Sequence, residues 1–200
     1  MLDVIDLDFD YQDRPLLAHV SFYLPPGGLL HLRGPNSAGK TTLLKLITGI
    51  YTPTSGSIKF AGQSIEHNKS EYQQQLCFVG HKTGVNPYLT LRENCYFDLH
   101  NHNNSTDFNK LAALFNLESH IDSLCGLLSA GQRRQAGLLR LWMTDAQLWL
   151  LDEPLVALDD SALSLIMAKI EQHRAGGGLV LLTSHQNLPL KKSHYQEYCL

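Results

Sequence analysis

The chain has 200 residues and a mass of 22.4 kDa, which allows one domain, or one domain with a small inserted subdomain. With 44% hydrophobic and 18% charged residues it can bury a sizeable core, and this excludes an intrinsically disordered chain. Its net charge of -3 offers no positive excess for a phosphate backbone, so we expect no nucleic-acid partner.

The first third of the chain predicts strands followed by a helix. Residues 1–6 lack the basic and then apolar pattern of a signal peptide, and no apolar run reaches the roughly 20 residues of a membrane span, so we expect a cytoplasmic chain. Strands are predicted at 20–24 and 29–33, joined by a Pro-Pro-Gly-Gly turn. From Gly39 the apolar residues recur at helical spacing, at Leu43, Leu44, Ile47 and Ile50.

The middle of the chain predicts a small helical insert. Strands are expected at 57–60 and 76–79, after which residues 82–128 lose strand character. Thr90 and Glu93 have the spacing of a capping box, which predicts a helix that begins there. A second helix is expected over about 106–116.

Histidines and cysteines suggest no metal or redox site. His100 and His102 lie in an Asn-rich run that favours a solvated loop over a metal site. The cysteines are too widely spaced for a CxxC motif, so we expect reduced thiols. They are Cys77, Cys95, Cys125 and Cys199.

The last third alternates helix and strand. Helices are predicted over about 130–143 and 160–173, and strands over 147–151 and 179–183. Such alternation is typical of parallel strands joined by crossover helices. We therefore predict an α/β fold with a mainly parallel core sheet, as one domain over residues 1–200 with a helical subdomain at about 82–128.

Residues 34–41 match the phosphate-binding pattern GxxxxGK[ST] between a strand and a helix. Glycines let backbone N–H groups converge on phosphate oxygens, while the helix start presents its positive end. We expect Lys40 to reach the β and γ phosphates of ATP and Thr41 to offer its hydroxyl to Mg²⁺. A chance match would lack the flanking strand and helix. The expected nucleotide-binding residues here are Gly34, Pro35, Asn36, Ser37, Ala38, Gly39, Lys40, Thr41 and Thr42.

Two adjacent acids end the apolar strand at 148–151. Because side chains alternate along a strand, the two carboxylates cannot have the same role. Asp152 fits the Mg²⁺ shell, and Glu153 fits a group that aligns the attacking water. A solvated acidic strand end is the alternative, which the phosphate-binding loop disfavours.

Residues 128–132 read Leu-Ser-Ala-Gly-Gln, and Ser129 and Gln132 again have capping-box spacing. A plain helix start would explain this, yet the segment resembles the LSGGQ signature of ATP-binding cassette (ABC) ATPases. Ala130 stands where the family more often has Gly. The resemblance implies a P-loop ATPase fold with an antiparallel N-terminal β part. It also implies nucleotide contacts by Ser129, Gly131 and Gln132.

The same resemblance assigns four further residues. Tyr11 lies where the family stacks an aromatic ring on adenine, and Asp159 resembles the acid of its D-loop. Their alternatives are a strand-edge aromatic and a helix cap. His185 resembles the switch histidine that contacts the γ phosphate, which makes it a catalytic residue with Lys40 and Glu153. His81 replaces the usual Gln that senses Mg²⁺ and the transport subunit.

Within the cassette family, four segments narrow the resemblance. They are residues 80–84, 86–94, 139–142 and 148–154. In so short a cassette they resemble the ATP-binding subunits of the bacterial cytochrome c maturation complex, a family named as haem exporters. The resemblance implies an ATPase, with ATP and Mg²⁺ as cofactors, that energises haem export or the release of a haem-loaded chaperone.

The resemblance also implies partners and alternatives. A second copy is expected to complete an ATP-sandwich dimer, and an integral membrane permease subunit to dock near residues 81–91 and hold the chain at the cytoplasmic face of the inner membrane. No haem ligand can be named. One alternative is an ATPase for a lipid, lipoprotein or small-solute transporter, and another is a soluble regulatory cassette. A small-molecule kinase would not explain the signature or His185.

Overall fold

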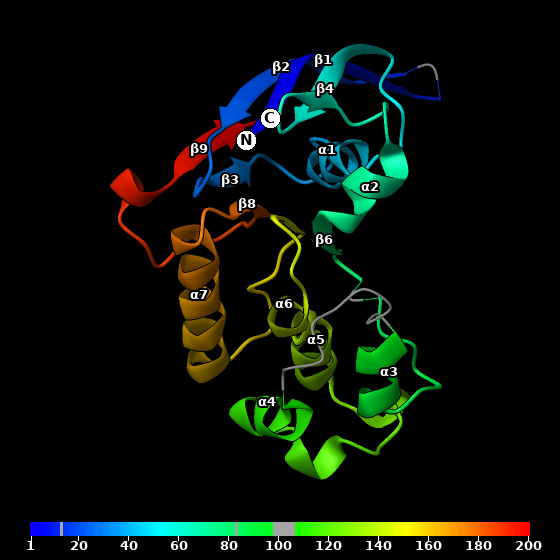
Figure 1. The fold of residues 1–200 in the computed structure, drawn as a ribbon, viewed down its shortest axis with the longest axis vertical. Helices are drawn as coiled ribbons and strands as arrows, with labels where there is room; N and C mark the ends of the chain where they lie inside the picture. Colours follow the sequence, from blue (N-terminus) through cyan, green and yellow to red (C-terminus); the bar gives the residue numbers. More distant parts are fainter. Residues whose placement is uncertain (13, 83, 98–106) are drawn as a thin grey trace. The chain divides into compact units, whose positions relative to one another are not determined.

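The computed structural model describes residues 1–12, 14–82, 84–97 and 107–200, which form two compact units (Figure 1). The first unit contains Met1–Phe78, Ala146–Glu153 and His173–Leu200. The second contains Val79–Asp145 and Pro154–Gln172, so it includes the expected helical insert and extends beyond it at both ends. The assignment of all 200 residues to one domain stays a prediction.

The first unit begins with an antiparallel sheet of strand order β2-β1-β4-β5. Its central strand β1 pairs antiparallel with both β2 and β4, as the resemblance implied. The strands are β1 (Leu2–Tyr11), β2 (Arg14–Leu24), β4 (Ser55–Phe60) and β5 (Gln63–Ser64).

Strand β1 contains a bulge that makes the strand hard to predict from the sequence. Its buried side chains alternate from Leu2 to Val4 and resume at Leu7, so one residue is inserted. The register shifts between Val4 and Leu7, and Asp6 has a left-handed φ of 46°. Gly56 of β4 accommodates the bulge, because a Cβ there would lie 2.2 Å from the Asp6 carbonyl oxygen. This broken alternation explains why no strand was predicted over 2–11.

The second sheet has the order β6-β7-β8-β3-β9. Strand β3 pairs parallel with β8 and β9, and β7 pairs parallel with β8, which confirms the predicted parallel core. Strand β9 was not predicted, because its polar side chains lie at the sheet edge and are mostly exposed. The strands are β3 (Leu29–Arg33), β6 (Leu76–Val79), β7 (Leu148–Leu151), β8 (Leu179–Thr183) and β9 (Gln196–Cys199).

The core of the first unit joins these strands to the first helix. Helix α1 (Lys40–Ile47) follows Gly39 directly, as expected, and its Leu43, Leu44, Leu46 and Ile47 are fully buried. They belong to one hydrophobic cluster with leucines of β3, β7 and β8. The cluster fixes the start of α1 next to the loop that leaves β3. Helix α2 (Lys69–Gln74), capped by Asn68, was not predicted.

The second unit is helical in the described residues. The capping box at its first helix is present: the Thr90 amide donates to Glu93 Oε2 at 2.8 Å, and the Glu93 amide donates to Thr90 Oγ1 at 3.1 Å. The expected helix over 106–116 is found as α4, whereas His100 and His102 lie outside the described residues. The helices are α3 (Leu91–Phe97), α4 (Phe108–Leu114), α5 (Ala130–Leu138), α6 (Arg140–Met143) and α7 (Asp160–Ala175), of which α7 continues into the first unit from His173. Short 3₁₀ turns lie at Glu118–His120, Cys125–Leu127 and, in the first unit, Lys192–His194.

The helix predicted over about 130–143 is found over those residues but is divided, because the chain forms α5 and α6 with a break at Leu139. The Trp142 amide bonds to the Leu139 carbonyl only three residues back, which tightens the turn there.

Neither a membrane span nor a clustered metal site is found in the described part of the chain. None of its helices is long and apolar enough to cross a bilayer. No three His, Cys, Asp or Glu side chains gather there to hold an ion. The four cysteines are free thiols, as predicted, and all but Cys199 are buried.

Candidate nucleotide-binding and hydrolysis site

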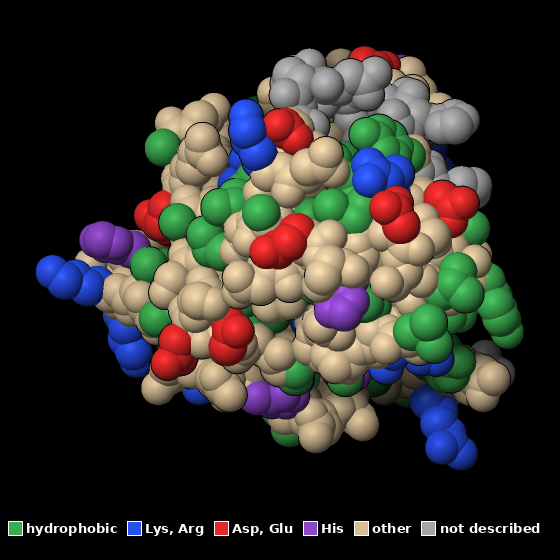
Figure 2. Space-filling view, turned by 90° about the horizontal axis from the view of Figure 1, so that it is seen from below, with side chains coloured by type: hydrophobic (Ala, Val, Ile, Leu, Met, Phe, Trp, Pro, Cys, Tyr) green, Lys and Arg blue, Asp and Glu red, His purple; other side chains and the backbone are tan. Residues whose placement is uncertain are grey.

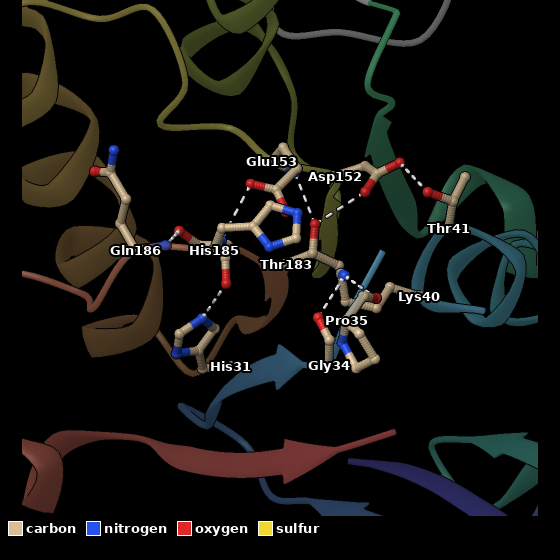
Figure 3. Close-up of polar contacts among 11 residues, drawn as sticks. His31, Gly34, Pro35, Lys40, Thr41, Asp152, Glu153, Thr183, His185 and Gln186 are labelled. Carbon is tan, nitrogen blue, oxygen red and sulfur yellow. Dashed lines mark hydrogen bonds and ion pairs between the residues drawn. The ribbon is translucent and has the colours of Figure 1, made fainter. Parts of the chain in front are cut away.

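The predicted catalytic residues come together at one edge of the parallel sheet (Figure 3). The loop of residues 34–39 leaves β3, the two acids follow β7, and His185 follows β8. These strands are neighbours in the order β7-β8-β3, and the carboxyl ends of parallel strands meet at one edge. All these residues belong to the first unit.

The loop after β3 encloses a buried cation. Lys40 is only 8% exposed, and its Nζ donates to the carbonyl oxygens of Gly34 at 2.8 Å and Pro35 at 3.0 Å. Gly39 has a φ of +97°, and a Cβ there would lie 2.7 Å from a Leu17 methyl group, so glycine suits the position. The ammonium therefore stands beside the positive end of α1, and this arrangement suits a phosphate group.

Two hard oxygen donors meet where Mg²⁺ was expected. Thr41 Oγ1 lies 2.7 Å from Asp152 Oδ2, and Asp152 is 2% exposed. A hydroxyl and a carboxylate oxygen at this separation are ligands of the type that Mg²⁺ prefers, so the pair fits that ion. His81 belongs to the second unit and is exposed, and its role toward the metal stays a prediction.

Glu153 is held apart from Asp152 and meets His185. Its side chain is 9% exposed, and its Oε1 lies 3.5 Å from His185 Nε2. The His185 amide donates to Glu153 Oε2 at 3.4 Å. The backbone of Glu153 has a left-handed φ of 53°. Such a conformation costs energy in a non-glycine residue and is often found at functional sites.

Thr183 was missed by the sequence reading and connects both acids. Its Oγ1 accepts the Glu153 amide at 2.8 Å and donates to Asp152 Oδ1 at 2.9 Å. The signal in the sequence is small, a single hydroxyl at the end of the apolar strand β8. Its role depends on β8 lying next to β7, which the local sequence does not state.

The signature segment forms the predicted helix start in the second unit. Ser129 Oγ accepts the Gln132 amide at 3.1 Å, and Gln132 Oε1 accepts the Ser129 amide at 2.8 Å. Gly131 lies close to the loop before α7, since a Cβ there would be 3.2 Å from the Ala157 carbonyl oxygen. The capping box is confirmed, whereas the phosphate contact of these residues stays a prediction.

Asp159 has the helix-capping role given as its alternative, and Tyr11 is an exposed residue at the end of a strand. Asp159 Oδ1 accepts the Ala162 amide at 2.7 Å, and this bond lowers the pKa of the carboxyl group. The residue thus caps the start of α7. Tyr11 ends β1 and is 53% exposed. The roles of both residues toward a nucleotide stay predictions.

Comparisons with known proteins agree with this geometry. The profile of the family described as "ABC transporter" matches residues 17–156. The chain is 62% identical over 200 residues to the cytochrome c biogenesis ATP-binding export protein CcmA of Legionella pneumophila (strain Paris), covering 100% of both. It is 37% identical over 202 residues to the protein of the same name from Yersinia pestis, covering 100% of this chain and 93% of that one.

Solved structures share the fold. A structure described as the ATP-binding subunit of an ABC transporter superimposes with a TM-score of 0.83 at 25% identity, covering 92% of this chain and 79% of the other. A dimeric ATP-binding cassette in a post-hydrolysis state, bound to ADP and Pi, superimposes with a TM-score of 0.78 at 20% identity. The match covers 93% of this chain and 88% of the other. The chain therefore belongs to the ABC transporter family, as an ATP-binding ATPase subunit of the cytochrome c biogenesis export type.

Proposed function

We propose that this chain hydrolyses Mg²⁺-ATP at the inner membrane to energise c-type cytochrome biogenesis, through haem export or release of a haem-loaded chaperone. The observation that carries this proposal is the 62% identity, over the whole length of both chains, to a cytochrome c biogenesis export ATPase. The ATPase part of it is supported by the position of Lys40 within its loop, by the Thr41–Asp152 contact and by the Glu153–His185 contact.

In this proposal the residues of the site have distinct roles. Lys40 exchanges its carbonyl partners for the β and γ phosphates, while Thr41 and Asp152 would hold Mg²⁺, which would neutralise charge on those phosphates. Glu153 aligns the attacking water and polarises it. His185 contacts the γ phosphate and keeps Glu153 in place, as their 3.5 Å separation suggests.

A second copy of the chain completes the site. In the proposed dimer, Ser129 and the amides at the start of α5 meet the γ phosphate bound by the partner copy. The exposure of Ser129 at the start of α5 supports this arrangement, because the positive end of a helix suits an anion. Hydrolysis then opens the dimer and moves the attached subunit.

An integral membrane subunit docks on the second unit. The segments around Pro87 and Gly126 are joined by bonds from the Gly126 amide to the Pro87 carbonyl and from the Cys125 amide to the Leu89 carbonyl, each 2.9 Å long. They carry Tyr88, which is 84% exposed, and Leu127, which is 80% exposed. Figure 2 shows a face on which hydrophobic side chains are exposed between charged ones. We assign these two side chains to the contact with a cytoplasmic helix of the permease.

Affinity purification from detergent-solubilised membranes tests the proposal. We expect the tagged chain to retain an integral subunit required for cytochrome c maturation, identified by mass spectrometry. Tyr88→Glu should lose that subunit, whereas Tyr23→Glu, which changes an exposed tyrosine of β2 in the first unit, should keep it. Recovery of a permease for a lipid, lipoprotein or small solute would contradict the assigned pathway.

A further inference from the structure

A histidine lies within the parallel sheet, between Leu30 and Leu32 along its own strand. His31 is fully buried in β3, between Leu182 of β8 and Glu197 of β9 in the strand register. An imidazole buried in such a place loses its hydration, which destabilises the fold unless the ring forms a hydrogen bond within the protein. Its partner therefore indicates what it does.

That partner is the backbone immediately before His185. His31 Nε2 lies 3.1 Å from the carbonyl oxygen of Ser184 (Figure 3). Because a carbonyl oxygen can only accept, we assign the proton of the neutral ring to Nε2. Burial lowers the pKa of His31, which favours this neutral form. The other nitrogen, Nδ1, has no hydrogen-bond partner in the described part of the chain and lies 3.9 Å from Glu197 Oε1.

The bond from His31 restrains a peptide group that also contacts Glu153. The carbonyl of Ser184 and the amide of His185 belong to one planar unit and point in opposite directions. Holding the carbonyl at His31 therefore directs the amide toward Glu153 Oε2, which it meets at 3.4 Å. The His185 ring, on the next Cα, lies 3.5 Å from the other oxygen of the same carboxylate.

We propose that His31 is a positioning residue for ATP hydrolysis. Its Nε2–H fixes the Ser184–His185 peptide and so keeps His185 against Glu153, without touching nucleotide itself. This inference rests on the proposed function, since it requires Glu153 to align the water. We therefore expect His31 to affect the rate of hydrolysis and not the binding of ATP. In the contacts described, the His31 ring bonds to Ser184, whereas Lys40 bonds to the carbonyl groups of its own loop.

Two nearly isosteric variants test the role of the donor. The amide of His31→Gln can occupy the place of Nε2 and donate to Ser184, whereas His31→Met fills similar space without a donor. We expect His31→Gln to keep kcat within about twofold of the original chain and His31→Met to lose roughly three- to tenfold, the scale of one lost hydrogen bond. The KM for ATP should be the same in both variants.

A comparison of His31→Gln with His31→Asn keeps the test decisive if the Met variant does not fold. The shorter amide of His31→Asn reaches the position of Nδ1 and not that of Nε2, so it should lose kcat as His31→Met does. Equal kcat values for the donor-bearing Gln variant and the variants without that donor would overturn the proposal. Loss of activity through a raised KM for ATP would overturn it as well.

A further variant separates this inference from the proposed function. In a Glu153→Gln background, His31→Met should still form the ATP-bound dimer, because nucleotide binding does not depend on His31. Loss of that dimer on adding His31→Met would overturn the positioning role. Hydrolysis at the original rate by Glu153→Gln alone would instead contradict the proposed function, and the comparison of the Gln and Met variants of His31 distinguishes the two failures.

Discussion

Lys40 carries the only side-chain cation in residues 34–42, and its Nζ already lies among the carbonyl groups of that loop. Lys40→Ala should weaken ATP binding about tenfold or more, because a charged donor to phosphate is lost and no neighbour replaces it. Titration with a fluorescent ATP analogue measures this. Lys45→Ala removes the same charge from the same helix, where the ammonium lies over the Tyr51 ring, and should bind normally. Unchanged affinity in Lys40→Ala would refute the phosphate-binding assignment.

His31 should make the stability of the protein depend on pH. Burial lowers its pKa in the folded state, so as the pH falls below about 6.5 the unfolded chain takes up the proton first. The stabilisation is therefore present above that pH and is lost as the pH falls toward the folded-state pKa. The difference in Tm between the original chain and His31→Gln, taken as original minus variant, should decrease as the pH is lowered from 7.5 to 5.5. A constant difference would show that His31 does not titrate in this way.

The residues that sequence reading found differ in kind from those it missed. Lys40, Thr41, Asp152 and Glu153 stand at fixed spacings within local motifs, and each lies where the motif predicts. Thr183 acts only through strand pairing, since it connects two acids that are 30 or more positions away in the chain. His31 and its partner Ser184 are separated by 153 positions. Such roles depend on strand order, which no local pattern states.

At the scale of elements, regular periodicity was predicted well and irregular periodicity was not. The strands at Leu29–Arg33 and Leu179–Thr183 are continuous and buried, and their predicted bounds agree with the structure. Strand β1 was missed because the bulge at Asp6 breaks its alternation. The break at Leu139 divides a helix whose apolar spacing continues across it. Local backbone irregularities therefore account for the main errors.

The two capping boxes should separate stability from function. Ser129→Ala and Thr90→Ala each remove a side-chain cap, and each should lower the free energy of unfolding by about 1 kcal/mol. Only Ser129 is assigned to the partner's γ phosphate, so only Ser129→Ala should also weaken ATP-dependent dimers. Urea unfolding and size-exclusion chromatography in a Glu153→Gln background measure the two effects. Equal weakening of the dimer by both variants would contradict the role given to the signature segment.

At the scale of the whole molecule, the first unit holds Lys40, Thr41 and the two acids of the proposed ATP site. The second unit holds the signature helix and the exposed Tyr88 and Leu127. The parallel core, the antiparallel N-terminal sheet and the family were all predictable, because the motifs are specific and lie in the expected chain order. The wider extent of the second unit could not be predicted, because residues 154–172, which follow Glu153 in the chain, also belong to it.

The adjacent acids should behave differently when each loses its charge. Asp152→Asn weakens the pair formed with Thr41, so Mg²⁺-ATP binding and hydrolysis should fall together and the dimer should be weak. Glu153→Gln keeps the size of the side chain and loses only the charge that aligns water. Its hydrolysis should fall by roughly 10²–10⁴-fold, the usual scale of a general base, while ATP binding persists.

The most direct test of the account is size-exclusion chromatography of these two variants with Mg²⁺-ATP, alongside a measurement of ATP hydrolysis. We expect Glu153→Gln to accumulate as an ATP-bound dimer and Asp152→Asn not to do so, and we expect the original chain to elute mainly as a monomer once its nucleotide is hydrolysed. Normal hydrolysis by Glu153→Gln, or a trapped dimer formed by Asp152→Asn instead, would contradict the roles given to the two carboxylates.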